Sequence, residues 1–301
     1  MPGKIMKALL AGGAVGGAAA GGTAAVMAHN LVLPRTFSLE EEKAWLNQHG
    51  LWGDYDQIPH TDYTVAGKDG YVLHCEYAMT NPGSRKIVIL THGYTSNRYG
   101  SLKYLGVYRA LGFNCVLYDC RGHGENTPSP CSVGNLEAED LLHVIEDTYL
   151  RYGEDIELGL HGESMGSAAS LSVLKFRPRV QFVVADCGFA SLYDLMGRLY
   201  RENHVGFLLD PVNLMMGKMY HFTLKQTCPR EALRGNQVPL CLIHGAADTF
   251  IRPENSDELA QATSGYQEVH KVEGAEHARS RYVLGEEAYT EIVGAFLWNL
   301  K

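Results

Sequence analysis

Residues 161–166 read HGESMG, and the pentapeptide Gly162-Glu163-Ser164-Met165-Gly166 within them fits the pattern G-x-S-x-G. This pattern is typical of a serine on a sharp turn between a strand and a helix, with its hydroxyl lifted clear of the sheet. Glycine two residues before and two residues after the serine leaves room for neighbouring chain at so crowded a turn. Because the pentapeptide alone is common by chance, its meaning depends on the sequence around it.

The flanking sequence predicts the strand and the helix that such a turn needs. Residues 156–162 (IELGLHG) form a short apolar run of strand length. Residues 164–178 carry small and apolar side chains at helical spacing, up to Pro178. Small residues such as Ala168 let this helix lie close against a sheet. We therefore expect Ser164 at a junction of strand, turn and helix.

From residue 60 onward the chain alternates strand-like and helix-like stretches. Residues 61–79 predict a hairpin that turns at Lys68-Asp69-Gly70. The alternation predicts an α/β fold with one mainly parallel sheet, helices on both faces, and ligands at the carboxyl ends of the strands. A stretch rich in methionine and aromatic residues, about 188–236, interrupts the alternation and is predicted to form a small helical lid. The other predicted strands are KIVILTHG (86–93), FNCVLYD (113–119), IELGLHG (156–162), FVVADCG (182–188), PLCLIHG (239–245) and QEVHKVEG (267–274).

Composition limits the classes of function. The chain has 301 residues, of which 46% are hydrophobic, and this suits one α/β domain with a small insertion. A formal net charge of −8 argues against nucleic acid as a partner, because phosphate binding needs a basic face. The seven cysteines are scattered without a C-x-x-C pair or zinc-ligand spacing, so we predict neither a metal site nor a disulfide framework.

The N-terminal segment is predicted to meet a membrane. Residues 9–28 (LLAGGAVGGAAAGGTAAVMA) carry no charge and follow two lysines. We expect a single membrane anchor within residues 1–35, with the domain of residues 36–301 on the external side. Two alternatives stay open. One is a signal segment cleaved before His29, which would release the protein, and the other is a buried or disordered Gly/Ala arm.

Two residues later in the chain are candidate partners for Ser164. A serine nucleophile needs a histidine to accept its proton and a carboxylate to orient that histidine. Where a serine stands on this kind of turn, the chain order is serine, acid, histidine. Asp248 follows the strand-like run LCLIHG, and His277 lies in the loop after the last strand-like run. We therefore predict Ser164, Asp248 and His277 as a catalytic triad.

Other polar residues near predicted strand ends have alternative interpretations. Asp186 could supply the acid from an earlier strand. Asp119 is predicted to pair with Arg121 and to shape a loop. His161 and His244 lie inside apolar runs, so they are predicted to be buried core histidines.

An oxyanion hole is predicted from the stretch ILTHGYTSN. The strand ends at His92-Gly93, and this should bring the backbone N–H of Tyr94 beside the Ser164 turn. Together with the Met165 N–H, it would supply two donors for a developing oxyanion.

The motifs HGYTS, YDCRGHGEN, HGESMG, HGAADTF and GAEHAR resemble, in this order and spacing, those of the alpha/beta-hydrolase superfamily, across about residues 60–300. The apolar N-terminus, the hairpin DGYVLHCEY and the stretch VGNLEAEDLLHVIEDTYLRYG are more narrowly similar to a bacterial group of membrane-linked hydrolases. Members of that group are labelled serine aminopeptidase-like or prolyl-oligopeptidase-like. The resemblance implies an alpha/beta-hydrolase fold with the triad and the oxyanion donors given above.

The mechanism predicted from these residues is acyl transfer to water, which needs neither a metal nor an organic cofactor. An apolar lid favours small carboxylic esters with apolar acyl groups as substrates. The alternative is a serine peptidase or amidase acting on short peptides, in which Glu202 or Asp210 of the lid would bind the substrate amine. A membrane-tethered binding module is a third class. The apolar lid residues are Tyr193, Met196, Tyr200, Phe207, Met215, Met216, Met219 and Phe222.

Overall fold

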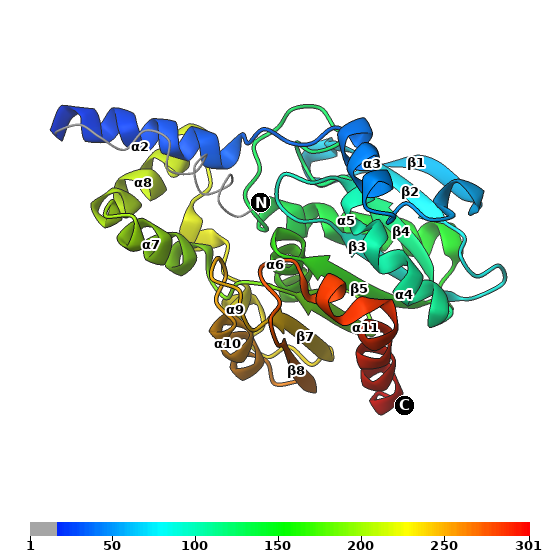
Figure 1. The fold of residues 1–301 in the computed structure, drawn as a ribbon. Coiled ribbons are helices and arrows are strands. Elements are labelled where there is room, and N and C mark those ends of the chain that lie inside the picture. The colour runs from blue at the N-terminus through cyan, green and yellow to red at the C-terminus, as the bar shows by residue number, and fades with distance from the viewer. Residues whose placement is uncertain (1–16) are drawn as a thin grey trace.

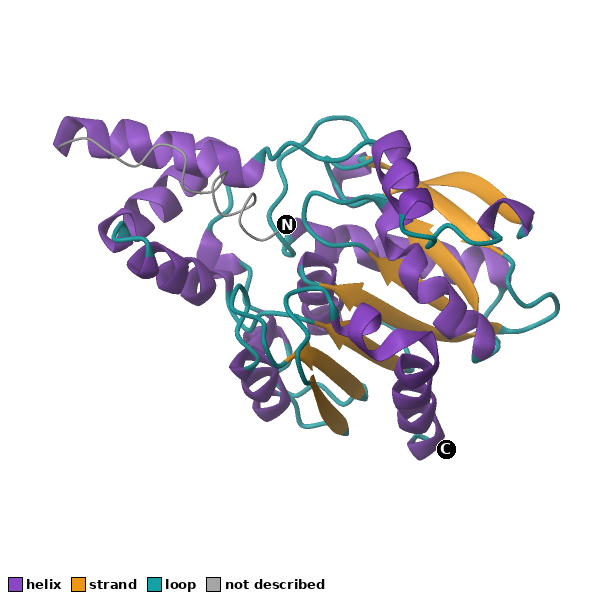
Figure 2. Ribbon diagram, in the orientation of Figure 1, coloured by secondary structure: helices purple, strands orange, loops and turns teal. Residues whose placement is uncertain are grey.

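The computed structural model describes residues 17–301, in which one eight-stranded sheet is covered by helices on both faces (Figure 1; Figure 2). The strand order is β1-β2-β4-β3-β5-β6-β7-β8. β1 pairs antiparallel with β2 and β2 with β4, whereas all other neighbours are parallel. The predicted mainly parallel sheet between helical layers is confirmed.

The strands coincide with the apolar runs of the sequence. β4, β6 and β7 are buried along their whole length, because helices cover both faces of the sheet there. The predicted hairpin turns where Asp69 and Gly70 adopt positive φ angles of 57° and 73°. The strands are β1 (His60–Ala66), β2 (Val72–Ala78), β3 (Lys86–Thr91), β4 (Asn114–Tyr118), β5 (Glu157–Glu163), β6 (Phe182–Asp186), β7 (Leu240–Gly245) and β8 (Gln267–Val272).

Local sequence explains where some helices begin or bend. The Ser38 hydroxyl accepts from the Glu41 N–H, and the Glu41 carboxylate accepts in return from the Ser38 N–H, so the pair caps α3. α11 kinks at Gly285, whose φ is 77°. The helices are α2 (Gly17–Val32), α3 (Leu39–Gln48), α4 (Leu105–Ala110), α5 (Leu136–Tyr152), α6 (Met165–Ser172), α7 (Leu192–Glu202), α8 (Leu209–Tyr220), α9 (Pro229–Ala232), α10 (Glu254–Ala262) and α11 (Ser280–Asn299).

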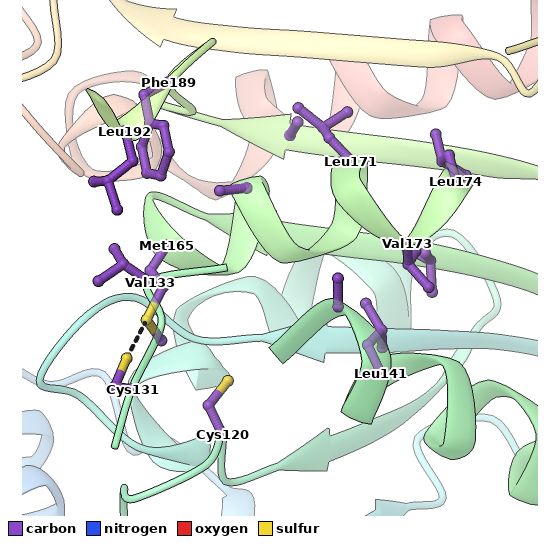
Figure 3. Packing of buried hydrophobic residues seen from close by; sticks show 14 of the residues in the cluster. Cys120, Cys131, Val133, Leu141, Met165, Leu171, Val173, Leu174, Phe189 and Leu192 are labelled. Carbon is purple, nitrogen blue, oxygen red and sulfur yellow. Dashed lines mark hydrogen bonds between the residues drawn. The ribbon is translucent and has the colours of Figure 1, made fainter. Parts of the chain in front are cut away.

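Two apolar clusters, one on each face of the sheet, form the core. Alternate residues of β3 divide between them, since Ile87 and Ile89 belong to the first cluster and Val88 and Leu90 to the second. Residues of α5, α6 and α10 contribute to the first cluster, and residues of α3, α4 and α11 to the second. Figure 3 shows the first cluster around α6.

The helix after Ser164 is shorter than predicted. α6 ends at Ser172, and a 3-10 helix continues the chain over Val173–Phe176. Arg177 then adopts a left-handed φ of 54° directly before Pro178, which disfavours further helix. All eight residues of α6 are buried, as a helix packed closely on a sheet requires.

The chain between β6 and β7 contains α7, α8 and α9 and lies beside the sheet rather than over it (Figure 1). Its apolar residues do not all face the protein. Met196, Tyr200 and Met216 are buried, whereas Phe207 is 71% exposed and Met219 is 40% exposed. Packing on the domain therefore accounts for only part of the apolar character of this segment.

The N-terminal segment does not match the prediction of a membrane anchor. Within residues 17–301, no helix combines the length and the apolar character needed to cross a membrane. α2 has only 16 residues, and residues 9–16 of the predicted span lie outside the described part of the chain. The prediction of an anchor, and with it that of a membrane location with an external domain, is therefore wrong.

Protein covers the apolar side of this segment instead. Met27, Ala28 and Leu31 are buried, and α2 packs against α8 (Figure 1). His29, the predicted first residue after signal cleavage, lies inside α2, and its Nδ1 is 2.8 Å from the Tyr220 hydroxyl. An apolar Gly/Ala run has the same sequence pattern whether lipid or protein covers it. One face of α2 is thus buried against protein, whereas Val26 on another side is 49% exposed.

Candidate active site

The turn that carries Ser164 is strained and closely packed. Ser164 has φ 54° and ψ −113°, and its N–H donates to the Asp186 carbonyl on β6 at 2.9 Å. A Cβ atom on Gly162 would lie 2.2 Å from the Gly166 carbonyl oxygen, and one on Gly166 would lie 2.1 Å from the Thr91 carbonyl oxygen. Any side chain at either position would collide with backbone. The spacing of the two glycines is therefore a steric requirement of this turn.

Three chain segments bring the predicted triad residues together. Ser164 lies between β5 and α6, Asp248 follows β7, and His277 follows β8. The Ser164 Oγ is 3.0 Å from His277 Nε2, and His277 Nδ1 is 2.7 Å from Asp248 Oδ2. With the proton on Nδ1 donated to the carboxylate, Nε2 is free to accept the serine proton.

Asp248 is held as an anion. Its Oδ1 accepts from the backbone N–H groups of Phe250 and Ile251, each at 2.9 Å. Burial raises the pKa of Asp248, but hydrogen bonds from His244 and His277 outweigh burial and hold the pKa at about 2. A carboxylate that stays charged at neutral pH can stabilise a positively charged His277 ring.

Asp186, the alternative acid, is fully buried beneath the Ser164 turn. Its carboxylate accepts from the hydroxyls of Ser280, at 3.0 Å, and of Tyr104 and Tyr289, each at 3.1 Å. Burial, together with the charge of Glu163, raises the pKa of Asp186 to about 6. Over the described residues its carboxylate makes no hydrogen bond with a histidine, so the geometry favours Asp248 as the partner of His277.

The predicted oxyanion donors are the backbone amides of Tyr94 and Met165, which belong to residues beside Ser164. Both residues line a cavity together with Ser164. The loop after β3 runs close to the serine, because a Cβ atom on Gly93 would be 3.7 Å from the Ser164 Cβ. Among the described residues neither amide donates to another protein group. Both amides are therefore available to a ligand oxygen.

Two buried histidines fix the loop that carries Tyr94. Burial lowers the pKa of His92 to about 3, so its ring is neutral. His92 Nε2 accepts from the Cys120 N–H at 2.9 Å, and Nδ1 is 2.8 Å from the Gly93 carbonyl. His123 Nε2 accepts from the Thr95 N–H at 3.3 Å. This role of the two histidines was not predictable from the sequence, because both contacts join segments that are distant in the chain.

Two cavities meet at Ser164. The smaller, of about 40 Å³, is almost entirely apolar. The larger, of about 180 Å³, lies on the side of α3 and the loop after β8, and charged groups line part of it. Figure 3 shows Phe189, Leu192, Val133 and Met165, all of which line the smaller cavity, gathered at the N-terminal end of α6. Of the eight predicted apolar lid residues, only Met196 contributes to this wall within the described chain.

The larger cavity contains charged groups that the sequence analysis missed. Lys103 and Glu163 form a buried ion pair there, and the Tyr104 hydroxyl donates to Glu163 at 2.7 Å. Burial lowers the pKa of Lys103, but the Glu163 charge raises the pKa by more, so the ammonium stays charged. Glu42 of α3 also lines this cavity, and burial raises its pKa above the usual value. No local motif marks Glu42 or Lys103, because a tertiary contact between α3 and the loop after β3 creates their surroundings.

The acidic residues predicted to bind a substrate amine do not line either cavity. Glu202 pairs with Arg198 and Arg252, both at 2.8 Å, and Asp210 accepts from the Tyr193 hydroxyl at 2.6 Å. Glu202 and Asp210, the two candidates for binding a substrate amine, therefore lie outside both cavities at Ser164.

The predicted pairing of Asp119 with Arg121 is also wrong. Asp119 pairs with Arg98 at 2.5 Å, and Arg121 pairs with Asp140 at 2.7 Å. Both pairs join residues far apart in sequence, so spacing could not reveal them. The other rival prediction holds, since His161 and His244 are both buried. In the part of the chain that the structure describes, no cluster of histidine, cysteine and acidic side chains is arranged to hold a metal ion.

Residues 82–195 match the family model described as "Serine aminopeptidase, S33". An uncharacterized protein of Bacillus subtilis (strain 168), YqkD, is 26% identical over 259 residues, which make up 84% of each chain. Monoglyceride lipase of Mus musculus is 27% identical over 128 residues, or 41% of this chain and 40% of the lipase.

Solved structures share the fold. An esterase from Pyrococcus furiosus superposes with a TM-score of 0.65 at 23% identity, covering 82% of this chain and 94% of the esterase. An esterase from Thermogutta terrifontis gives a TM-score of 0.55 at 17% identity, covering 80% and 99%. Identities this low show the fold alone. They confirm the predicted alpha/beta-hydrolase fold, and the family match over residues 82–195 supports the predicted superfamily and an enzyme of the hydrolase type.

Proposed function

We propose that this chain is a serine hydrolase that cleaves carboxylic esters of apolar acyl groups through an acyl-enzyme. The observation that carries the proposal is the chain of hydrogen bonds from Ser164 through His277 to Asp248. A serine hydroxyl becomes a nucleophile when a neighbouring imidazole can take its proton and a carboxylate orients that imidazole.

In the first half of the reaction, the Ser164 Oγ attacks the ester carbonyl carbon and its proton passes to His277 Nε2. The carbonyl oxygen becomes negatively charged and accepts hydrogen bonds from the amides of Tyr94 and Met165. Asp248 stabilises the imidazolium that has formed. His277 then donates the proton to the departing alcohol, which leaves Ser164 acylated.

In the second half, His277 takes a proton from a water molecule, and the resulting hydroxide attacks the acyl carbon. The same two amides hold the second oxyanion. His277 returns its proton to the Ser164 oxygen as the bond to the acyl group breaks, so the carboxylic acid leaves and the enzyme is restored. The proton transfers between Ser164 and His277 use two groups that lie 3.0 Å apart, and Asp248 lies 2.7 Å from the other ring nitrogen of His277.

The two cavities suggest which side holds which part of the ester. The smaller cavity is apolar and includes Met165, one of the two oxyanion donors, so we assign it the acyl chain. The larger cavity is more polar and would hold the leaving alcohol. An apolar acyl group in the smaller cavity gains the free energy of burial there.

One observation favours the peptidase or amidase alternative. Glu42 lines the larger cavity with its pKa raised by burial. A substrate ammonium group placed beside Glu42 would favour the ionised carboxylate and would be held by it. This acidic residue comes from α3, and not from the segment between β6 and β7 where the sequence analysis expected one.

One panel of substrates tests both candidates. Replacing Ser164 by alanine (Ser164→Ala) should lower kcat for p-nitrophenyl butyrate by on the order of a thousandfold or more, because the triad acts as a unit. A fluorophosphonate probe should label Ser164 alone, as read by mass spectrometry of tryptic peptides. Aminoacyl arylamides assayed beside the esters should be turned over more slowly.

The matched control is Ser170→Ala, on the same helix as the turn. Ser170 is buried, and its hydroxyl has no hydrogen-bond partner within residues 17–301, so this variant should keep its activity and its labelling. Labelling that persists in Ser164→Ala would exclude Ser164 as the nucleophile. Arylamides cleaved tenfold faster than esters, with that preference lost in Glu42→Gln, would establish the peptidase candidate in place of the esterase.

A further inference from the structure

The end of α2 forms one wall of the smaller cavity. Leu31 lies in the last turn of α2, is 2% exposed and lines the cavity beside Ser164. The facing walls come from the segment after β6, with Leu195 and Met196, and from the segment after β7, with Ile251. A residue from the N-terminal end of the described chain thus completes a pocket built otherwise from much later segments.

Hydrogen bonds on both sides hold this wall in place. The Leu31 carbonyl accepts from the Tyr94 hydroxyl at 2.7 Å. The next carbonyl, of Val32, accepts from the Cys131 N–H at 2.8 Å. Leu31 is therefore tied to the loop that carries the Tyr94 amide and to the loop before α5. The backbone at Leu31 therefore cannot move away from the cavity without breaking these bonds.

α2 packs on α8 over the turns that precede Leu31. The two helices pack along each other (Figure 1), with Ala24, Met27 and Ala28 buried. Nδ1 of His29 and the Tyr220 hydroxyl, 2.8 Å apart, join the helices beside this apolar contact. The helix that carries Leu31 is thus held in place by the segment between β6 and β7.

We propose that Leu31 is a specificity-determining residue that limits the length of the acyl chain; the inference rests on the proposed esterase function. A cavity of about 40 Å³ has room for roughly three or four heavy atoms, because one water-sized group occupies about 10–15 Å³ measured in this way. An acetyl or butyryl chain fits within that volume, and a longer chain meets the Leu31 side chain.

Leu31→Ala removes three carbon atoms from the wall and should admit a longer chain. The experiment uses the full chain and measures kcat/KM for p-nitrophenyl acetate, butyrate, hexanoate and octanoate. We expect the wild type to prefer butyrate. Each additional methylene that the enlarged pocket can bury should raise kcat/KM about fourfold. With about two more methylenes buried, the octanoate-to-butyrate ratio should rise by on the order of tenfold in Leu31→Ala.

Two further variants of Leu31 test the same wall. One enlarges the cavity less than Leu31→Ala does, and the other fills it. Leu31→Val removes one carbon and should shift the preferred chain by about one methylene, even if the alanine variant is too unstable to assay. Leu31→Phe should fill the cavity and lower the butyrate-to-acetate ratio. Leu33→Ala is the control, since Leu33 is 36% exposed and does not line the cavity. Its chain-length profile should match that of the wild type.

The outcomes separate this inference from the proposed function. If ester cleavage depends on Ser164 while folded Leu31→Ala and Leu31→Val keep the wild-type profile, the inference about Leu31 fails and the esterase proposal stands. If the wild type cleaves none of the four esters and the probe does not label Ser164, both fail. A shift in Leu33→Ala equal to that in Leu31→Ala would also overturn the inference, since the effect would not come from the cavity wall.

Discussion

β6 and β7 are neighbouring parallel strands, and each leads to a buried aspartate at the same edge of the sheet. Asp186 is the last residue of β6, and Asp248 follows β7 by three residues. The surroundings of the two aspartates shift their pKa values in opposite directions. The pKa of Asp186 is raised to about 6, chiefly by burial, whereas that of Asp248 is lowered to about 2 because hydrogen bonds outweigh burial.

The difference arises from what faces each carboxylate. Hydroxyl groups of Ser280, Tyr104 and Tyr289 surround Asp186, and Glu163 adds a second negative charge nearby. Asp248 faces His244, His277 and two backbone amides instead. A position at a strand end is thus insufficient to define a catalytic acid. The donors around the carboxylate decide whether it stays charged and can orient a histidine.

The largest expected effect is a difference in kcat between variants of the two aspartates. Asp248→Asn should lower kcat for p-nitrophenyl butyrate by roughly a thousandfold to ten-thousandfold, because an amide favours the wrong tautomer of His277. Asp186→Asn should change kcat by less than tenfold, because Asp186 does not contact the histidine. Steady-state kinetics of both variants, with circular dichroism to show that each is folded, gives the ranking. The reverse ranking would move the acid to β6.

The second prediction concerns stability as a function of pH. The folded chain binds a proton at Asp186 more tightly than the unfolded chain, whose reference pKa is 3.8. The stability that this proton supplies is fully present below about pH 4 and is lost as the pH rises through about 6. Asp248 acts in the opposite sense: its contribution is present above about pH 4 and is lost as the pH falls through about 2.

Urea unfolding of wild type and Asp186→Asn at pH 4 and pH 7 measures the first of these effects. The variant cannot ionise at this position, so its free energy of unfolding relative to that of the wild type should rise by about 2–3 kcal/mol between the two pH values. Parallel pH dependence in the two proteins would mean that Asp186 titrates alike in the folded and unfolded states, and the contrast with Asp248 would disappear.

The smallest expected effect is a change in the free energy of unfolding when one hydrogen-bond donor to Asp186 is removed. Ser280→Ala removes a hydroxyl that donates to its carboxylate. At pH 7 the free energy of unfolding should fall by about 1–2 kcal/mol, since a hydrogen bond to a charged group is lost. At pH 4 the loss should be smaller, because the protonated acid depends less on donors. Ser170→Ala, which loses a buried hydroxyl without a partner, should show no such pH dependence.

Much of this fold could be predicted from the sequence, because its signals are local. Apolar runs mark the parallel strands, since a strand buried on both faces must be apolar throughout. The turn at Ser164 was predictable because Gly162 and Gly166 meet a steric demand that only glycine satisfies. The approach of Asp248 and His277 to the serine followed from their order at successive strand ends.

The missed features are those that tertiary contacts create. The apolar run at the N-terminus has the pattern of a membrane segment, and only the packing of α2 on α8 shows what covers residues 24–32. The partner of Asp119 is Arg98, 21 residues away in the chain. Glu42 and Leu31 reach the cavities from segments far ahead of the motifs. Neither the period nor the spacing of the sequence carries such information.

The backbone conformation at Ser164 lowers the stability of the folded chain, although the proposed reaction needs a serine there. Its φ of 54° with ψ of −113° suits glycine and costs a residue with a side chain about 1–3 kcal/mol. A glycine at this position would therefore give a more stable protein without the proposed nucleophile. A library selected for heat resistance alone would tend to discard the serine, so any effort to evolve a more robust enzyme from this chain must select for turnover at the same time.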